Sequence, residues 1–256
     1  MDFASTRSQR IYSDRRADPS WLQWCTLHLA PAGRAVVDIG CGGGIYSRGF
    51  AELGAASVVG VDQSEQYLGE ASASVAGLSG VRFCRGSAVD TGLADACADI
   101  VFERALIHHL SRGQQSANAR EAHRLLRGDG RLCVQDRSYE DVTADDPDFW
   151  IRATLFELFP GLLEFERARR PTTEDYTRLL GEAGFGRVQV LHLAETRRRY
   201  ADIEELAAEI LSRKGKSILF ELDDAQLAAY AHRLRERGVG QVLTERDRWT
   251  IWLADR

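Results

Sequence analysis

The sequence predicts an α/β fold built on a mostly parallel sheet with helices on both faces. Two observations support this prediction. Short apolar runs alternate with stretches of helical periodicity through the first half of the chain. The first of these runs also leads through a glycine-rich turn, Gly40 to Gly44, straight into a helical stretch. Alternation at this spacing implies right-handed crossovers between parallel strands that helices cover on each side.

Composition narrows the class of protein. The 256-residue chain is 44% hydrophobic and carries a formal net charge of −5. It can therefore bury a sizeable core, and its acidic balance argues against a general nucleic-acid binder. It has no apolar run of the roughly 20 residues that a membrane span needs, and its first residues lack a secretory stretch, so we expect a cytoplasmic protein.

Two residue patterns add expectations of their own. The five cysteines show no CxxC or other metal-ligand spacing, so we expect neither disulfides nor a metal site. We interpret the arginine run at 197–199 as a solvated loop or a strand edge.

Periodicity and end signals locate the elements of the first half. A first helix begins at Asp18-Pro19, with Asp18 as its cap and Pro19 in its first turn. Helices are also expected at 63–76 and at 114–127, the latter with Gly128 as its C-terminal cap. Strands are expected at 35–39, 57–61, 81–84, 99–102 and 131–136.

The second half is mainly helical. A helix beginning at Asp146-Pro147 is apolar on nearly every side and stops at Pro160-Gly161, so it is either a lid or part of a core. Thr172 resembles the first residue of a capping box, and its helix ends near Gly184. The remaining elements are strands at 188–191 and 249–253 and, between them, two amphipathic helices around 203–211 and 227–234.

The glycine turn indicates what the first half binds. Gly40, Gly42 and Gly44 form a GxGxG pattern, whereas the dinucleotide fingerprint requires a glycine where Ile45 stands. A turn of this kind lets backbone N–H groups approach a nucleoside that has no pyrophosphate. Asp62, at the end of the second strand, can accept both hydroxyls of a ribose, which disfavours NADP.

Five motifs in order make residues 34–137 resemble the class I S-adenosylmethionine-dependent methyltransferases, near the ubiquinone and menaquinone biosynthesis branch. These motifs lie at 37–44, 59–64, 84–88, 99–110 and 125–132. The resemblance implies a Rossmann-like, seven-stranded, mostly parallel sheet with helical lid insertions and a last, antiparallel strand beside the fifth. It also implies a division into an N-terminal lid and helix (1–30), an S-adenosylmethionine-binding core (31–140), and lid insertions with C-terminal strands that complete the sheet (141–256).

The same resemblance implies a set of cofactor contacts. Gly40 and Gly42 would border the amino-acid tail of the cofactor, Asp62 would bind its ribose, and Gln63 would lie beside its adenine. The family often carries an acid where Ser87 stands, and Ser87 offers only a hydroxyl or backbone contact. The segment 12–16, with an aromatic residue and cations, is either a lid that holds the carboxylate of the cofactor or a solvated tail. The complete expected set comprises Tyr12, Arg16, Asp38, Gly40, Cys41, Gly42, Asp62, Gln63, Ser87, Ala88, Glu103 and Arg104.

Candidates for the chemistry follow the fourth and fifth strands, at the carboxyl edge where ligands bind. His108 and His109 have a suitable pKa for accepting a proton from the acceptor, although the family frequently has a histidine here that only packs against the following helix. Asp136 and Arg137 are substrate-facing candidates by the same geometry, and Trp150 is one on the aromatic helix.

The leading hypothesis is therefore methyl transfer to a small apolar or aromatic acceptor at an oxygen, nitrogen or carbon atom, without a metal, by a protein that could be a homodimer. An RNA or protein methyltransferase is a second hypothesis, disfavoured because Glu103 to Leu106 replace the Asn/Asp-Pro-Pro-Tyr motif. A third is a binding protein that has lost methyl transfer. A nicotinamide-dependent oxidoreductase is the least favoured.

Overall fold

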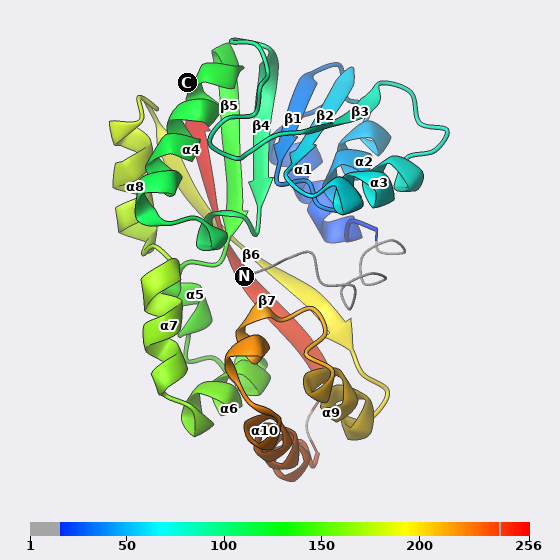
Figure 1. Ribbon diagram of the computed structural model, residues 1–256, viewed down its shortest axis with the longest axis vertical. Helices are drawn as coiled ribbons and strands as arrows, with labels where there is room; N and C mark the ends of the chain where they lie inside the picture. Colours follow the sequence, from blue (N-terminus) through cyan, green and yellow to red (C-terminus); the bar gives the residue numbers. More distant parts are fainter. Residues whose placement is uncertain (1–15, 241) are drawn as a thin grey trace.

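The computed structural model describes residues 16–240 and 242–256, and a seven-stranded sheet organises them (Figure 1). The strand order is β3-β2-β1-β4-β5-β7-β6, with parallel pairing from β3 to β5 and antiparallel pairing of β7 with β5 and β6. The strands are β1 (Ala35–Ile39), β2 (Ser57–Asp62), β3 (Val81–Arg85), β4 (Ala98–Arg104), β5 (Leu126–Asp136), β6 (Val188–Arg199) and β7 (Thr244–Asp255).

Helices cover both faces of the sheet because alternate strand residues point to opposite sides. On one face α4 (Arg112–Leu125) and α8 (Thr173–Glu182) pack on a core that includes Val37 and Val101. On the other face α1 (Pro19–His28) and α2 (Ile45–Glu52) pack on Val36 and Ile100. The α3 helix (Glu65–Ser74) lies against β2 and β3.

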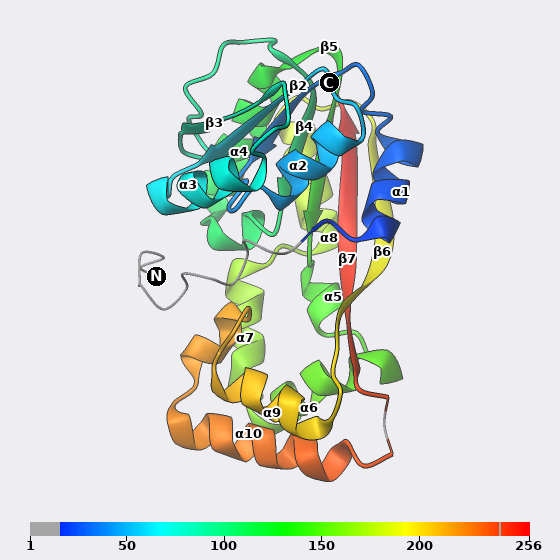
Figure 2. The ribbon, with the colours of Figure 1, turned by 90° about the vertical axis from the view of Figure 1, so that its right-hand side faces the viewer.

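The remaining helices form a second layer of structure, which we call the helical lobe. Strands β6 and β7 extend from the sheet into this lobe (Figure 2). Its core joins residues from three separate stretches of the chain, among them Leu155, Leu206 and Leu234. The lobe comprises α6 (Trp150–Leu158), α7 (Gly161–Arg169), α9 (Ile203–Leu211), the 3₁₀ helix η4 (Ser217–Glu221) and α10 (Asp224–Arg237), while α5 (Tyr139–Val142) and the 3₁₀ helix η3 (Pro147–Phe149) lead into it.

The α/β sheet and the antiparallel last strand beside the fifth are confirmed. Several element boundaries differ from the predictions. Gly128 is not a helix cap, because α4 ends at Leu125 and β5 begins at once. Pro160 ends α6 but also serves as the N-cap of α7, a helix that the sequence analysis missed.

The arginine run 197–199 lies on the edge strand β6, as predicted, but Arg197 is not solvated. It is largely buried, and its guanidinium forms ion pairs with Glu209 and Glu245. None of the described helices is both long and apolar enough to cross a membrane.

Candidate functional site

The glycine turn and Asp62 form one hydrogen-bonded unit at the carboxyl edge of the sheet. Three glycines of the turn adopt positive φ, with values of 71° at Gly40, 50° at Gly42 and 78° at Gly44. Asp62 accepts hydrogen bonds from the backbone N–H groups of Gly42 and Ser64, each at 2.9 Å. The turn therefore fixes the carboxylate in place before any ligand arrives.

The turn leaves room for a ligand. A Cβ atom added at Gly42 would meet no protein atom within 4 Å, whereas one at Gly44 would come within 2.9 Å of the Ala71 side chain. Gly42 thus faces open space and Gly44 faces the packed helix α3. Gly42 also lines a large cavity, so its backbone can closely approach a bound nucleoside.

That cavity has a volume of about 2390 Å³ and reaches from the glycine turn to the helical lobe. Most of the expected cofactor contacts line it. These are Arg16, Asp38, Gly40, Cys41, Gly42, Asp62, Gln63, Ala88 and Arg104. The residues present fit a nucleoside with an amino-acid tail, and the individual contacts stay predictions.

Three expected contacts do not follow this pattern. The Ser87 hydroxyl does not line the cavity and accepts a hydrogen bond from the N–H of Val89 at 3.3 Å. The Glu103 side chain turns away from the cavity to accept a hydrogen bond from Asn118 at 2.9 Å. Tyr12 lies outside the described residues.

Burial sets the protonation of two acids beneath the turn. Asp38 is 2% exposed and accepts a hydrogen bond from the Ser47 hydroxyl at 2.6 Å. Burial raises the pKa of Asp38 to about 7 and the pKa of Glu103 to about 8. Both groups can therefore carry a proton near neutral pH, and neither adds a full negative charge to the glycine-turn end of the cavity.

Arg104 lies in the cavity wall between two aromatic rings. Its guanidinium carbon is 4.5 Å from the centroid of the Tyr46 ring and 4.2 Å from that of the Trp249 ring. Glu195 pairs with it at 2.5 Å. These contacts hold a cation in the cavity wall, between the glycine turn and the helical lobe.

His108, in the cavity wall, forms a buried pair with Asp136. The imidazole lies on the short 3₁₀ helix η2 (Ile107–His109), with Nδ1 at 2.9 Å and 3.0 Å from the two carboxylate oxygens of Asp136. Burial lowers the pKa of His108, whereas the neighbouring imidazole and Arg170 keep the pKa of Asp136 low despite its burial. The pair is therefore a neutral imidazole whose Nδ1–H donates to a carboxylate, which leaves Nε2 as the acceptor.

Asp136 does not face the substrate as the sequence analysis expected. It is fully buried, it does not line the cavity, and Arg170 and the Arg137 N–H also donate to it. It contacts the His108 ring rather than the cavity. His109 lines the cavity beside His108, with the two ring centroids 4.0 Å apart, and burial lowers the pKa of His109 to about 4.

The two other substrate candidates have different positions. Arg137 lines the cavity and pairs with Asp247 at 2.8 Å. Trp150 does not line it; its side chain packs in the core of the helical lobe, and its neighbours Ile151 and Arg152 reach the cavity instead. Helical periodicity alone could not choose among these neighbours, because α6 is apolar on nearly every side.

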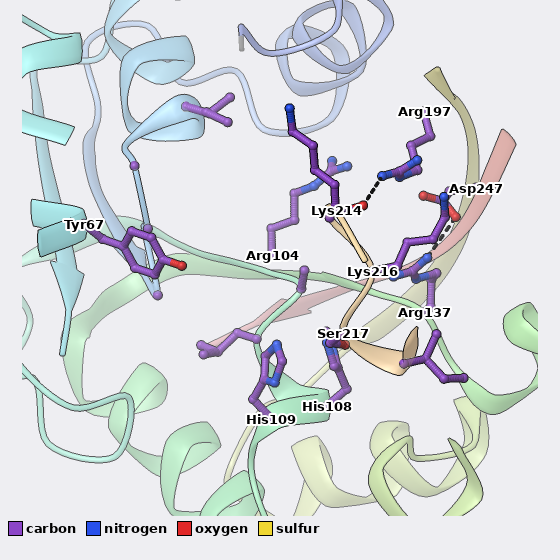
Figure 3. Close-up of a pocket in the computed structure, with 18 of the residues that line it drawn as sticks. Tyr67, Arg104, His108, His109, Arg137, Arg197, Lys214, Lys216, Ser217 and Asp247 are labelled. Atoms are coloured by element: carbon purple, nitrogen blue, oxygen red, sulfur yellow. Dashed lines mark hydrogen bonds and ion pairs between the residues drawn. The ribbon is translucent and has the colours of Figure 1, made fainter. Parts of the chain in front are cut away.

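The residues that the lobe contributes to the cavity were not predicted from the sequence. Many of them belong to the loop 212–217, which leads from α9 to the first residue of η4 (Figure 3). One signal was available. The chain has only two lysines, Lys214 and Lys216, and both lie in this loop.

The chain is similar to known methyltransferases in sequence. Residues 36–130 match the family described as methyltransferase domain. A protein of Synechocystis described as an uncharacterized methyltransferase is 30% identical over 159 residues, which is 62% of this chain and 69% of that protein. The ubiquinone biosynthesis O-methyltransferase of Paraburkholderia phytofirmans is 52% identical over 54 residues, which is only 21% of this chain and 23% of that enzyme.

Solved structures share the fold. A protein of Anabaena variabilis, named as a methyltransferase from an antibiotic biosynthesis pathway, superposes with a TM-score of 0.72 at 21% identity, covering 96% of this chain and 99% of that one. A phosphoethanolamine N-methyltransferase of Haemonchus contortus, in complex with phosphomonomethylethanolamine and S-adenosylhomocysteine, has a TM-score of 0.60 at 18% identity. That match covers 93% of this chain and 53% of the other.

Proposed function

The chain belongs to the class I S-adenosylmethionine-dependent methyltransferases, and we propose that it methylates a small-molecule acceptor bound between the glycine turn and the helical lobe. The observation that carries this proposal is the continuous cavity from Gly42 and Asp62 to the lobe, with His108 in its wall and the buried Asp136 paired with it. When bound, the cofactor supplies an electrophilic methyl group on a good leaving group. The residues of the chain must bind and orient the acceptor, exclude water and take up its proton.

We assign the cofactor end to the glycine turn, Asp62 and Gln63. The Asp62 carboxylate already accepts two backbone hydrogen bonds, so it is oriented to accept further ones from ribose hydroxyls. Arg104 lies beside this end and can pair with the carboxylate of the cofactor's amino-acid tail.

We assign His108 as the general base for an acceptor whose nucleophile arrives protonated. Its neutral Nε2 can accept the proton while Nδ1–H keeps its hydrogen bond to Asp136. Because burial lowers the pKa of His108, the imidazole is a weaker base than an ordinary histidine. The imidazolium formed in this way is stabilised by the Asp136 carboxylate, which acts through His108 rather than on the substrate. His109 is the alternative base, since it lines the same cavity.

The lobe end of the cavity supports an acceptor with an apolar part. Apolar side chains from α6, η4 and α10 line it, among them Ile151, Leu155, Ile218 and Leu227. The acidic balance of the chain, with a net charge of −5, favours such a molecule over RNA or DNA. An acceptor enclosed in this way would be shielded from water during the transfer.

Titration calorimetry with S-adenosylhomocysteine and, separately, NAD tests the cofactor end. We expect the wild-type protein to bind S-adenosylhomocysteine only, and Asp62→Ala to weaken that binding at least about tenfold through the loss of charge-assisted hydrogen bonds. Asp129→Ala removes an exposed carboxylate that does not line the cavity and serves as the matched control. A folded protein that ignored S-adenosylhomocysteine would overturn the assignment.

A screen of small acceptors for release of S-adenosylhomocysteine then tests turnover. Activity with small acceptors, lost in His108→Gln, supports the proposal. Activity on RNA or protein alone contradicts it. Tight cofactor binding without turnover on any acceptor class would favour the binding protein that has lost methyl transfer.

A further inference from the structure

The lysines of the chain are concentrated at one point of the cavity. Of the 33 lysine and arginine residues in the chain, only Lys214 and Lys216 are lysines. They lie two residues apart in the loop 212–217, and both line the cavity. Figure 3 shows them with Ser217 on this loop, near Arg137, Arg197 and Asp247 of the strand layer. We call these lysines, together with five of the arginines that line the lobe end of the cavity (Arg137, Arg152, Arg169, Arg170 and Arg197), the basic wall. Arg213 also lines the cavity and pairs with Asp224 at 2.9 Å.

Carboxylates only partly neutralise the basic wall. Asp247 is shared by two guanidiniums, those of Arg137 at 2.8 Å and Arg152 at 3.1 Å. Glu166 is likewise shared by Arg169 and Arg170, at 2.6 Å and 2.5 Å. Arg137 and Arg152 therefore share one carboxylate between two cations, whereas Arg170 has Asp136 as a second partner, so that the Arg169 and Arg170 pair is balanced.

The lysine loop adds to this excess. Lys216 contacts Glu209 at 3.2 Å and Glu245 at 3.0 Å, and Arg197 contacts the same two carboxylates. Lys214 is exposed to the cavity and forms no ion pair within residues 16–240 and 242–256. The basic wall thus carries more cations than carboxylates, with Lys214 unneutralised.

Hydrogen-bond donors also remain available. Of the three nitrogens of the Arg137 guanidinium, only Nη1 donates to a carboxylate within the described part of the chain. Its Nε is buried there without an acceptor. The Ser217 hydroxyl accepts a bond from Arg169 at 3.2 Å, which leaves its own O–H to donate. A ligand that presents several acceptor oxygens would satisfy these groups together.

The pKa values of the wall shift in both directions. Against the effect of burial, Asp247 raises the pKa of Arg137 and Glu245 raises that of Arg197. Burial lowers the pKa of Arg152 and of Lys216, and in Arg152 the neighbouring Arg137 lowers it further. Burial also lowers the pKa of Arg170 to about 10, with Arg137 and Arg169 adding to the effect. Such cations gain from an anion placed among them.

We propose that the basic wall binds a phosphoryl group, a phosphate or diphosphate, at one end of the methyl acceptor, through Lys214, Lys216 and Arg137. This proposal rests on the proposed function of the cavity. A phosphoryl group brings close to two negative charges and several acceptor oxygens, and it suits both the fork of an arginine and the point charge of a lysine. The apolar residues Ile151 and Leu155 would then contact the rest of the acceptor.

Calorimetry on the full chain, saturated with S-adenosylhomocysteine, tests this proposal with inorganic pyrophosphate and inorganic phosphate as probes and acetate for comparison. We expect one site for pyrophosphate or phosphate and none of similar strength for acetate. Lys214→Gln should weaken the phosphoryl probe about tenfold or more, since one charge-assisted contact is lost. Arg187→Gln removes an exposed cation that does not line the cavity, so it should change nothing.

The lysine count permits a second readout that needs no variant. Reductive methylation with ¹³C-formaldehyde preserves the charge of each lysine and labels only Lys214, Lys216 and the N-terminal amine. Pyrophosphate should shift the NMR signals of both lysines in a saturable way. Either readout is independent of turnover and of the identity of the acceptor.

Three results would overturn the inference. One is a protein that binds S-adenosylhomocysteine but neither phosphoryl probe. Another is phosphoryl binding that Lys214→Gln and Arg187→Gln change equally. The third is a Lys214→Gln variant that loses affinity for S-adenosylhomocysteine and not for pyrophosphate, because the loop would then serve the cofactor. Failure to bind S-adenosylhomocysteine at all would instead count against the proposed function.

Discussion

Asp136 is the residue that links the proposed base to the rest of the cavity wall. Its two oxygens accept hydrogen bonds from the His108 ring, from Arg170 at 3.1 Å and from the Arg137 N–H at 2.7 Å. A buried carboxylate with this many donors remains ionised, which is why its pKa is held low against the effect of burial. One residue thus fixes both the tautomer of His108 and the position of a buried arginine.

We predict that Asp136→Asn lowers kcat by about 10²- to 10⁴-fold, because the amide can no longer hold His108 in the Nδ1–H tautomer or stabilise its cation. Affinity for S-adenosylhomocysteine should change little, since Asp136 does not line the cavity. The variant should also lose stability, because Arg170 keeps its buried charge with one partner fewer. Steady-state kinetics, calorimetry and urea unfolding measure the three effects, with Asp129→Asn as control.

A purely structural role for Asp136 would give a different pattern. Loss of stability with an unchanged kcat in the fraction that remains folded would contradict the assignment of Asp136 as the positioning residue for His108.

The pH dependence of turnover gives a second prediction at this scale. Burial lowers the pKa of His108 to about 3, so the imidazole is neutral and able to accept a proton throughout the neutral range. Activity that depends on neutral His108 should therefore persist as the pH falls from 8 to about 5, whereas an ordinary histidine would lose half of its neutral form near pH 6.5. A kcat profile in overlapping buffers checks this, and an acidic limb centred near pH 6.5 would contradict it.

At the scale of the element, two glycines of the turn have different roles: Gly42 faces the cavity, and Gly44 packs against α3. Gly42 and Gly44 both adopt positive φ, so both tolerate a side chain poorly. Only Gly44 meets packed neighbours, whereas Gly42 faces the cavity. The first glycine therefore keeps space for the ligand and the second keeps α2 close to α3.

We predict that Gly42→Ala and Gly44→Ala fail in different ways. Gly42→Ala should cost about 1 kcal/mol of stability from its backbone conformation, and it should weaken S-adenosylhomocysteine at least tenfold because its Cβ enters the cavity. Gly44→Ala should lose more stability, since its Cβ would come within 3.0 Å of Phe83 and 2.9 Å of Ala71. Urea unfolding measures the stability of both variants, and calorimetry measures their affinity for S-adenosylhomocysteine. The prediction is contradicted if both variants lose affinity in the same proportion to their loss of stability.

How far the sequence predicted each element depended on how local its signals were. The strands β1 to β5 and the turn at Gly40 could be found because each signal lies within a few residues. Helix α7 was missed because Pro160 suits a helix start as well as a helix stop. Arg197 was taken as solvated because its partners Glu209 and Glu245 lie on other elements, one of them 48 residues away.

The same reasoning applies to the candidate site. The glycines and Asp62 could be predicted as a group, since they follow adjacent parallel strands that end at one edge of the sheet. The contact between Asp136 and His108 could not be predicted. Asp136 ends β5 and His108 lies on η2 beyond β4, so both are near the same edge of the sheet and only packing decides which one faces the cavity. Lys214 and Lys216 lie on a loop whose position is set by the packing of the helical lobe. Local periodicity in the sequence cannot predict where such a loop lies relative to the cavity.

At the scale of the whole molecule, the cavity is lined both by the edge of the sheet and by the helical lobe, each of which has its own hydrophobic core. The strands β6 and β7 connect these two parts (Figure 2). One face of this two-stranded ribbon presents Glu195, Asp247 and Trp249 to the cavity. The cofactor end belongs to the sheet and the lobe end to the helices, so the two ends can differ in stability while sharing the same strands.

We predict that damage to the core of the lobe leaves cofactor binding intact. Leu206 is fully buried in that core, and Leu206→Ala should cost about 2–5 kcal/mol from lost contacts and a residual cavity. Hydrogen exchange should quicken in α9 and α10 but not in β1 and β4, and affinity for S-adenosylhomocysteine should stay near the wild-type value while turnover falls. Leu132→Ala, an equally buried change in the sheet core, should instead quicken exchange in β4 and weaken the cofactor. If Leu206→Ala quickened exchange equally in the sheet strands, the two cores would unfold as one cooperative unit, and the lobe could not open for an acceptor without loosening the cofactor site.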